Sequence, residues 1–211
     1  MNLSFARLLR DALQALGVHV TMTRDADASV GMTERVTMIN TAAPNLMLSV
    51  HHNSAANPAA TGAETLIRQS TPRPGEMELA ERLAAAMAIA LGIPNRGVKR
   101  HEHGVLRTNT IAVTLELGFI NNPREEALLV QHDVQQRVVE SVVEVIADVF
   151  EIAVEPTGTP ILLDGSELRV RGMIVDGVTF APVRALGEAL GLHVQWNAEL
   201  GRVELRSIKS M

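Results

Sequence analysis

Apolar side chains recur along the chain with two different periods, and the period indicates the type of element. A spacing of three and four residues is typical of an amphipathic helix, whereas alternation or a short unbroken apolar run is typical of a strand. The helical period predicts helices over residues 3–16, 32–43, 75–93 and 123–150. The shorter patterns predict strands over residues 19–25, 45–53, 62–69 and 111–119. Because strands alternate with helices, we expect an α/β fold: a layered domain with a mostly parallel sheet flanked by helices.

The character of the sequence changes after residue 153. Residues 154–160 contain the segment EPTGTP, which is typical of a linker. Residues 161–211 contain two Asp-Gly turns, short strands, a helix around residues 183–190 and a closing hairpin. The sequence therefore predicts a larger α/β domain over residues 1–153, followed by a linker and a small α+β module.

Composition and charge narrow the possible classes of protein. With 46 % hydrophobic and 20 % charged residues, the 211-residue chain has the composition of a folded globular protein. A net charge of −5 argues against nucleic acid as the main partner, because phosphate binding needs a basic surface. The absence of cysteine excludes disulfides, thiolate metal ligands and cysteine nucleophiles. No apolar run is long enough for a transmembrane segment, and Arg7, Arg10 and Asp11 interrupt the first helix, so we expect no signal peptide in this chain.

Two adjacent histidines end the second predicted strand. Successive side chains of a strand point to opposite faces, so His51 shares a face with Ser49 and Asn53, whereas His52 lies on the other face. The two imidazoles are therefore not expected to bind one metal ion together. The alternation leaves open whether His51 is a metal ligand or a structural or solvated residue.

Glu116 is an acidic residue inside the apolar strand over residues 111–119. A buried carboxylate is unfavourable unless it is paired, hydrogen-bonded or close to a metal. Burial raises the pKa of a glutamate towards neutrality, which suits a general base. The alternative is a carboxylate that faces solvent or pairs with an arginine such as Arg24 or Arg107. The pattern does not choose between these two interpretations.

Five segments occur in an order and spacing that resemble the zinc-dependent N-acetylmuramoyl-L-alanine amidases, the peptidoglycan hydrolases of the Amidase_3 type. They are VTMTRDAD, MTERVTMIN, LMLSVHHNS, GAETLI and RGVKRHEHGVLRTNTIAVTLELGFINNPREEALL, and the resemblance covers about residues 1–150. It implies an enzyme that cleaves the amide between N-acetylmuramic acid and the L-alanine of the stem peptide. The implied partner is peptidoglycan, and the implied location is the cell envelope or the extracellular space.

The resemblance also implies roles for individual residues. His51 matches a zinc ligand of the family. Glu116 matches the catalytic acid/base, which takes a proton from the zinc-activated water and returns it to the leaving amine. The motif around Glu116 implies that Gly118, Phe119 and Asn122 shape the loop that presents it. Further positions expected to line the substrate cleft are Asn53, Glu64, His103 and Arg107.

The chain departs from the family at its beginning. In the family, a first strand supplies a zinc-binding His, and a Glu just before the first helix supplies another ligand. Met1 already lies in or at the edge of that helix, and His19 matches neither ligand. A catalytic zinc usually has three protein ligands, so the implied Zn2+ site, with His51, is incomplete in this chain. We also expect an unpaired sheet edge or an open groove, with poorer solubility than a complete domain.

Three explanations of the incomplete site stay open. The chain is an amino-truncated form of an active enzyme, or a naturally shortened relative that binds metal poorly. In the third explanation another group substitutes for the missing ligands, such as His52, His101, His103 or Glu64. The leading hypothesis is the amidase, inactive or impaired in this form. The alternative is a non-catalytic cell-envelope or peptidoglycan-binding protein on a degenerate amidase scaffold.

The segment DGVTFAPVRALGEALGLHVQWN resembles the small domain named after the N-terminal region of copper amine oxidases. The name implies no copper here, because His193 is the only histidine of the module and the chain has no cysteine. Val194 and Trp196 alternate with Gln195 on a predicted strand, which favours packing of the indole over stacking on a sugar. The resemblance suggests an accessory module that binds cell wall or an envelope protein.

Overall fold

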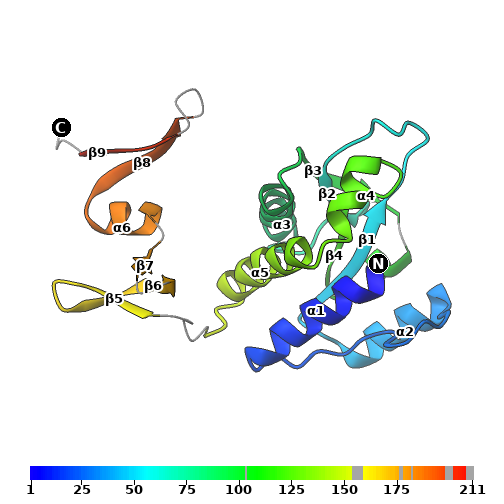
Figure 1. The fold of residues 1–211 in the computed structure, drawn as a ribbon. Coiled ribbons are helices and arrows are strands. Elements are labelled where there is room, and N and C mark those ends of the chain that lie inside the picture. Colours follow the sequence, from blue (N-terminus) through cyan, green and yellow to red (C-terminus); the bar gives the residue numbers. More distant parts are fainter. Residues whose placement is uncertain (103, 154–158, 176–177, 182, 198–201, 208–211) are drawn as a thin grey trace. The chain divides into compact units, whose positions relative to one another are not determined.

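The computed structural model describes residues 1–153 except residue 103, and residues 159–207 except 176–177, 182 and 198–201. The chain divides into two compact units, Met1–Ala153 and Val154–Met211 (Figure 1). Among the described helices, none combines the length and the apolar character needed to cross a membrane.

A four-stranded sheet forms the centre of the first unit (Figure 1). Its strands, in spatial order, are β1 (Leu46–Asn53), β4 (Ile111–Phe119), β2 (Ala63–Arg68) and β3 (Asn95–His101). The β1–β4 and β2–β3 pairs are parallel, whereas the central β2–β4 pair is antiparallel. The predicted α/β fold with a mostly parallel sheet is therefore confirmed, and β1 and β3 form its edges.

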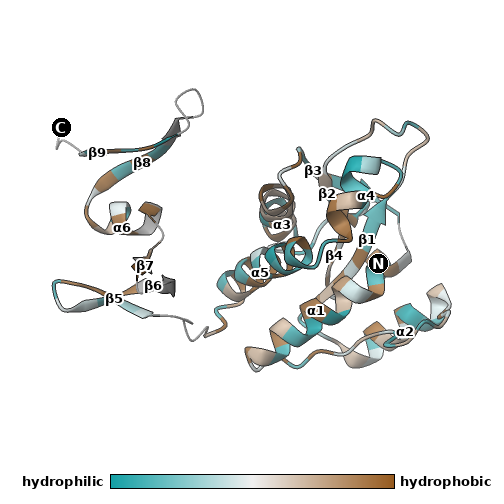
Figure 2. Cartoon of the chain, in the orientation of Figure 1, coloured by the Kyte–Doolittle hydropathy of each residue, from teal (hydrophilic) through white to brown (hydrophobic). Residues whose placement is uncertain are grey.

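Helices cover both faces of this sheet. One face packs against α1 (Asn2–Ala15), α3 (Glu76–Leu91) and α5 (His132–Val149). The other face packs against α2 (Met32–Ala42) and the short 3₁₀ helix η1 (Gly104–Arg107). Figure 2 shows α3 mostly in brown, in keeping with a helix whose apolar side is buried against the strands. The burial of these side chains, at about 1.5–3 kcal/mol for each large one, is the main stabilising contribution.

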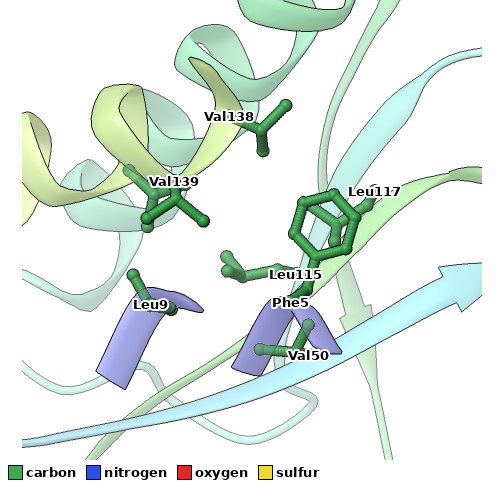
Figure 3. A pocket seen from close by; sticks show the side chains of 8 residues that line it. Phe5, Leu9, Val50, Leu115, Leu117, Val138 and Val139 are labelled. Atoms are coloured by element: carbon green, nitrogen blue, oxygen red, sulfur yellow. The ribbon is translucent and has the colours of Figure 1, made fainter. Parts of the chain in front are cut away.

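The strands contribute alternate residues to the two cores, as a period of two requires. Ala112 and Met47 belong to the smaller cluster on the α2 side, whereas Val113 and Leu115 belong to the larger one. Figure 3 shows where α1, α5 and the sheet meet in the larger core. A gap of about 10 Å³ is left there, among Phe5, Leu9, Val50, Leu115, Leu117, Val138, Val139 and Val142. Because all of these side chains are apolar and the gap is no larger than one water, it is a packing void rather than a binding site.

The strand predicted over residues 19–25 is wrong: these residues form no strand. A strand needs a hydrogen-bonded neighbour, and the space between this segment and β1 is an open groove. The segment is held to α1 instead, because the Asp25 carboxylate pairs with Arg7 and with Arg10, each at 2.8 Å. The expected open groove beside an unpaired sheet edge is thus present, along the outer edge of β1.

The helix predicted over residues 123–150 is divided into two. α4 (Pro123–Leu129) begins with the expected proline, and α5 follows after a break at Val130 and Gln131. Gln131 has extended backbone angles, φ −76° and ψ 128°. The Gln135 side chain donates a hydrogen bond to the Leu129 carbonyl at 2.7 Å, which replaces a bond lost at the break.

The pattern of apolar residues did not predict β3. Its sequence, NRGVKRH, has one apolar side chain, Val98, among charged and polar residues. Charged side chains are typical of edge strands, because they discourage pairing with another molecule. β3 lies at the edge of the sheet opposite β1.

The second unit is built mainly of strands. They are β5 (Thr159–Leu163), β6 (Ser166–Val175), β7 (Val178–Phe180), β8 (Leu192–Asn197) and β9 (Arg202–Ser207), with the helix α6 (Val183–Ala189). The predicted helix and the closing β8–β9 hairpin are confirmed. Asp164 and Gly165, with φ of 51° and 81°, turn β5 into β6, whereas the second predicted Asp-Gly turn, 176–177, lies outside the described residues. The predicted linker ended at Pro160, but β5 already begins at Thr159.

Candidate active site

Three polar side chains form a row across the sheet of the first unit. His51 of β1 is paired in register with Glu116 of β4, and Glu116 is paired with Glu64 of β2. The strand period places them on the face that packs against α2 and η1, because Met47 lies four residues before His51 and Ala112 lies four residues before Glu116 in the same strands. The row brings together three residues that lie far apart in the sequence.

Glu116 has the environment of a proton-transfer group. Its side chain is 9 % exposed, and its Oε2 atom is buried without a hydrogen-bond partner among the described residues. Burial, and then the charge of Glu64, raise the pKa of Glu116 to about 7. The alternative interpretation, an ion pair between Glu116 and Arg24 or Arg107, is wrong. Arg24 pairs with Asp27 at 3.6 Å, and Arg107 pairs with Glu102 at 3.4 Å.

Glu64 is held in place by two donors. Asn53 Nδ2 donates to Glu64 Oε1 at 2.8 Å, and Arg96 Nε donates to Glu64 Oε2 at the same distance. The Arg96 guanidinium lies over the Phe119 ring, 5.1 Å from its centroid. Asn53 and Arg96 therefore lie beside the row as hydrogen-bond partners of Glu64, and sequence reasoning did not single out Arg96.

The two histidines face opposite sides of the sheet, as the alternation indicated. His52 packs edge-on against Phe5 of α1, with ring centroids 5.4 Å apart, and its Nδ1 hydrogen-bonds Asn2 Oδ1. Burial lowers the pKa of His52 to about 4. His51 is half-buried and lines the groove beside β1. His52 is therefore not placed to substitute for a ligand beside His51.

A buried carboxylate fixes the strand end that follows Glu116. Glu125 of α4 accepts hydrogen bonds from the amides of Gly62 at 2.9 Å and Phe119 at 2.7 Å. Gly118, with φ of +126°, passes so close that an added Cβ would lie 3.0 Å from Glu125 Oε2. The end of β4 thus needs a glycine at this position. Asn122, another expected scaffold residue, caps α4, because its side chain accepts hydrogen bonds from the Arg124 and Glu125 amides in the first turn of that helix.

The remaining candidates stand apart from the row. Arg107 forms an exposed ion pair with Glu102 at 3.4 Å, and the structure records no contact between it and Glu116. His103 lies outside the described residues. His101 is exposed at the end of β3, two strands away from Glu116 in the sheet.

Comparison with known proteins identifies the first unit. Residues 1–148 match the family model described as N-acetylmuramoyl-L-alanine amidase. The chain belongs to the N-acetylmuramoyl-L-alanine amidase family. We call Met1–Ala153 the amidase unit. Residues 162–210 match the model described as copper amine oxidase N-terminal domain, which supports the expected second module.

Two curated relatives have names that describe amidases. The chain is 31 % identical over 144 residues to the probable cell wall amidase LytH of Staphylococcus saprophyticus, a match that covers 66 % of this chain and 46 % of that protein. It is 29 % identical over 132 residues to the N-acetylmuramoyl-L-alanine amidase LytC of Bacillus subtilis, covering 62 % and 27 %. The chain thus spans less than half the length of these curated relatives.

Solved structures of amidases share the fold. The catalytic domain of CwlV from Bacillus (Paenibacillus) polymyxa var. colistinus superposes with a TM-score of 0.66 at 28 % identity, over 72 % of this chain and 83 % of that one. An N-acetylmuramoyl-L-alanine amidase from Clostridium difficile 630 superposes with a TM-score of 0.67 at 26 % identity, over 71 % and 81 %.

The family is generally zinc-dependent, so we tested whether the described residues fit a zinc ion. His51 offers an imidazole, and Glu116 Oε2 is a buried oxygen without a described partner. However, the described part of the chain contains no group of three or more His, Cys, Asp or Glu side chains that could hold a metal. A catalytic zinc usually has three protein ligands. The described residues therefore do not by themselves fit a catalytic zinc ion.

Proposed function

We propose that the amidase unit hydrolyses the amide between N-acetylmuramic acid and the L-alanine of the peptidoglycan stem peptide. The observation that carries this proposal is the buried carboxylate of Glu116, whose Oε2 has no hydrogen-bond partner among the described residues, at the centre of the row His51–Glu116–Glu64. Family membership and the names of the relatives support the substrate.

In this proposal Glu116 moves the proton. A carboxyl group with a pKa near 7 is half ionised at neutral pH, so it can accept a proton from the attacking water and then donate it to the leaving amine. The charge of Glu64, whose carboxylate accepts hydrogen bonds from Asn53 and Arg96, contributes to the raised pKa of Glu116. Glu125 orients the end of β4, and so the loop beyond Glu116.

We propose zinc as the cofactor, with His51 as one of its ligands, and the described residues do not complete the ligand set. When bound, the metal would supply polarisation of the scissile carbonyl and activation of water. The chain should therefore be impaired as it stands.

The test is the release of new L-alanine amino groups from purified peptidoglycan, measured by end-group labelling at a fixed excess of zinc. We expect Glu116→Gln to abolish release, since an amide cannot move the proton. The matched control is Glu140→Gln, the same substitution at an exposed position of α5. Equal release by Glu116→Gln and wild type would remove Glu116 from the mechanism.

A second function is favoured by one observation, the incomplete ligand set among the described residues. On this alternative the chain binds peptidoglycan without cleaving it. Co-sedimentation with insoluble peptidoglycan, with no amino groups released at any zinc concentration, would support binding and contradict hydrolysis. In either case we propose a location at the cell envelope or outside the cell, and an accessory binding role for the second unit.

A further inference from the structure

Thr114 of β4 is a buried polar residue that has no role in the reaction proposed above. It is 1 % exposed, and its hydroxyl oxygen has no hydrogen-bond partner among the described residues. The other buried threonines of the described chain each donate their hydroxyl to a backbone carbonyl; they are Thr65, Thr108 and Thr110. A buried hydroxyl without a partner is unfavourable, so Thr114 is an exception that requires an explanation.

A second buried oxygen without a partner lies close to Thr114 in the same strand. Glu116 follows two residues later, so both side chains leave the sheet on the same face. Its Oε2 atom is fully buried and has no hydrogen-bond partner among the described residues. The other two such atoms of the described chain lie elsewhere, on His52 at the opposite face and on Arg73 before α3. The two oxygens thus form a pair on the face that carries the site.

The spacing of the two side chains suits one water molecule between the oxygens. A strand rises about 3.3 Å per residue, so Thr114 and Glu116 start about 6.6 Å apart. A water that makes a hydrogen bond of about 2.8 Å to each of two oxygens joins atoms up to about 5.6 Å apart. Because the longer glutamate side chain covers the remaining distance, one water can bond both oxygens.

The neighbouring strands supply a third polar group on one side only. Ser49 of β1 is paired in register with Thr114, so its hydroxyl lies on the same face. On the other side Thr114 is paired with Leu66 of β2, which packs in the smaller apolar core. A buried water typically makes about three hydrogen bonds. Ser49, Thr114 and Glu116 provide that number, and Leu66 closes the site with an apolar side chain.

We propose that Thr114 holds Glu116 in place through one buried water, which bonds Thr114 Oγ1, Glu116 Oε2 and the Ser49 hydroxyl. Thr114 is then a positioning residue. It fixes the buried oxygen of the carboxylate and leaves Oε1 for proton transfer. This water is structural and is not the water that attacks the amide. The effect on the reaction rests on the proposed function, whereas the link between the side chains does not.

The test is a double-mutant cycle in the full 211-residue chain, measured by urea unfolding at one fixed pH. Valine has nearly the shape of threonine but no hydroxyl. If the hydroxyl bonds the water, Thr114→Val should lower the folding equilibrium constant of wild type about fivefold. A hydroxyl that is truly without a partner predicts the opposite sign, because valine removes an unfavourable buried group.

The second arm of the cycle uses Glu116→Met, which removes the carboxylate but keeps a long side chain. In this background the water has lost a partner, so Thr114→Val should change the equilibrium constant by less than about twofold. Thr114→Ser keeps the hydroxyl and loses only a methyl group, so its effect should be the same in both backgrounds. Thr65→Val is the matched control, because the Thr65 hydroxyl donates to the Ala80 carbonyl at 3.0 Å and its loss should not depend on Glu116.

Release of amino groups from peptidoglycan then tests the positioning role. Thr114→Val should slow release without reducing the amount of chain that co-sediments with peptidoglycan, and Thr114→Ser should restore most of the rate. A wild-type chain that releases nothing but shows the coupling would contradict the proposed function and support the link between Thr114 and Glu116.

Three results would overturn the proposal. The first is a Thr114→Val variant that is more stable than wild type. The second is an equal effect of Thr114→Val in the wild-type and Glu116→Met backgrounds, or release by Thr114→Val at the wild-type rate. The third is a high-resolution crystal structure in which no water lies within about 3.2 Å of both Thr114 Oγ1 and Glu116 Oε2.

Discussion

Replacing Glu116 with glutamine should stabilise the amidase unit at neutral pH. The side chain is 9 % exposed and one of its oxygens has no described partner, so its charged form is unfavourable in the folded state. The folded pKa of about 7 exceeds the ordinary value of 4.5. The folded state therefore holds a proton between these pH values that the unfolded state has released.

The sign and size follow from linkage. Stability associated with protonated Glu116 is complete below pH 4.5 and is lost as the pH rises to about 7. At about 1.4 kcal/mol per pKa unit, the loss amounts to about 3 kcal/mol. Glutamine cannot ionise, so the Glu116→Gln variant does not lose this stability. The difference in free energy of unfolding between the variant and wild type should therefore be larger at pH 8 than at pH 4, by up to about 3 kcal/mol in favour of the variant.

The assay is urea unfolding of both proteins at pH 4 and pH 8, followed by far-ultraviolet circular dichroism. The long helices α1, α3 and α5 belong to the amidase unit, so this signal reports mainly on it. Trp196, the only tryptophan, belongs to the second unit and gives an internal control by fluorescence, which should not change. The Glu140→Gln variant controls for removal of a charge. A difference between variant and wild type that is the same at both pH values would refute the assigned environment of Glu116.

Three further predictions concern the surroundings of the site. In the Glu116→Gln background, lowering the pH from 6.5 to 4 should reduce the free energy of unfolding by up to about 3 kcal/mol. The reason is that the pKa of His52 is lowered to about 4 in the folded state, so the unfolded state takes up the proton first. A free energy of unfolding that does not change over this pH range would show that His52 is solvated. Glu125→Ala should lower the free energy of unfolding, measured with urea, by about 3 kcal/mol, because it leaves the buried amides of Gly62 and Phe119 without an acceptor. A decrease below about 1 kcal/mol would show that Glu125 does not hold these two amides in place. Dialysis against buffer of low free zinc should leave much less than one zinc per chain by atomic emission, and a stoichiometric zinc lost in His51→Ala would show that the chain completes the site with other groups.

The parts of the fold that the sequence predicted are those with a clear apolar period. β1 and β4 were predicted to within a residue, because both are buried runs that depend little on their neighbours. The orientation of His51 and Glu116 also followed, since the strand period fixes the face on which each side chain lies.

The parts that it missed depend on contacts distant in sequence. β3 is a strand because it pairs with β2, although its charged residues look like a solvated loop. Residues 19–25 have the pattern of a strand but no neighbouring strand. Arg96 and Glu125 look like ordinary surface charges, and their roles depend on Glu64 and on backbone amides that the fold brings near them.

The most direct test of the account is release of L-alanine amino groups from peptidoglycan by the wild-type chain across a range of zinc concentrations. The account predicts slow release that rises with zinc and disappears in both Glu116→Gln and His51→Ala, while Glu140→Gln retains it. A wild-type chain that releases nothing at any zinc concentration, or variants at Glu116 and His51 that release amino groups as fast as wild type, would contradict it.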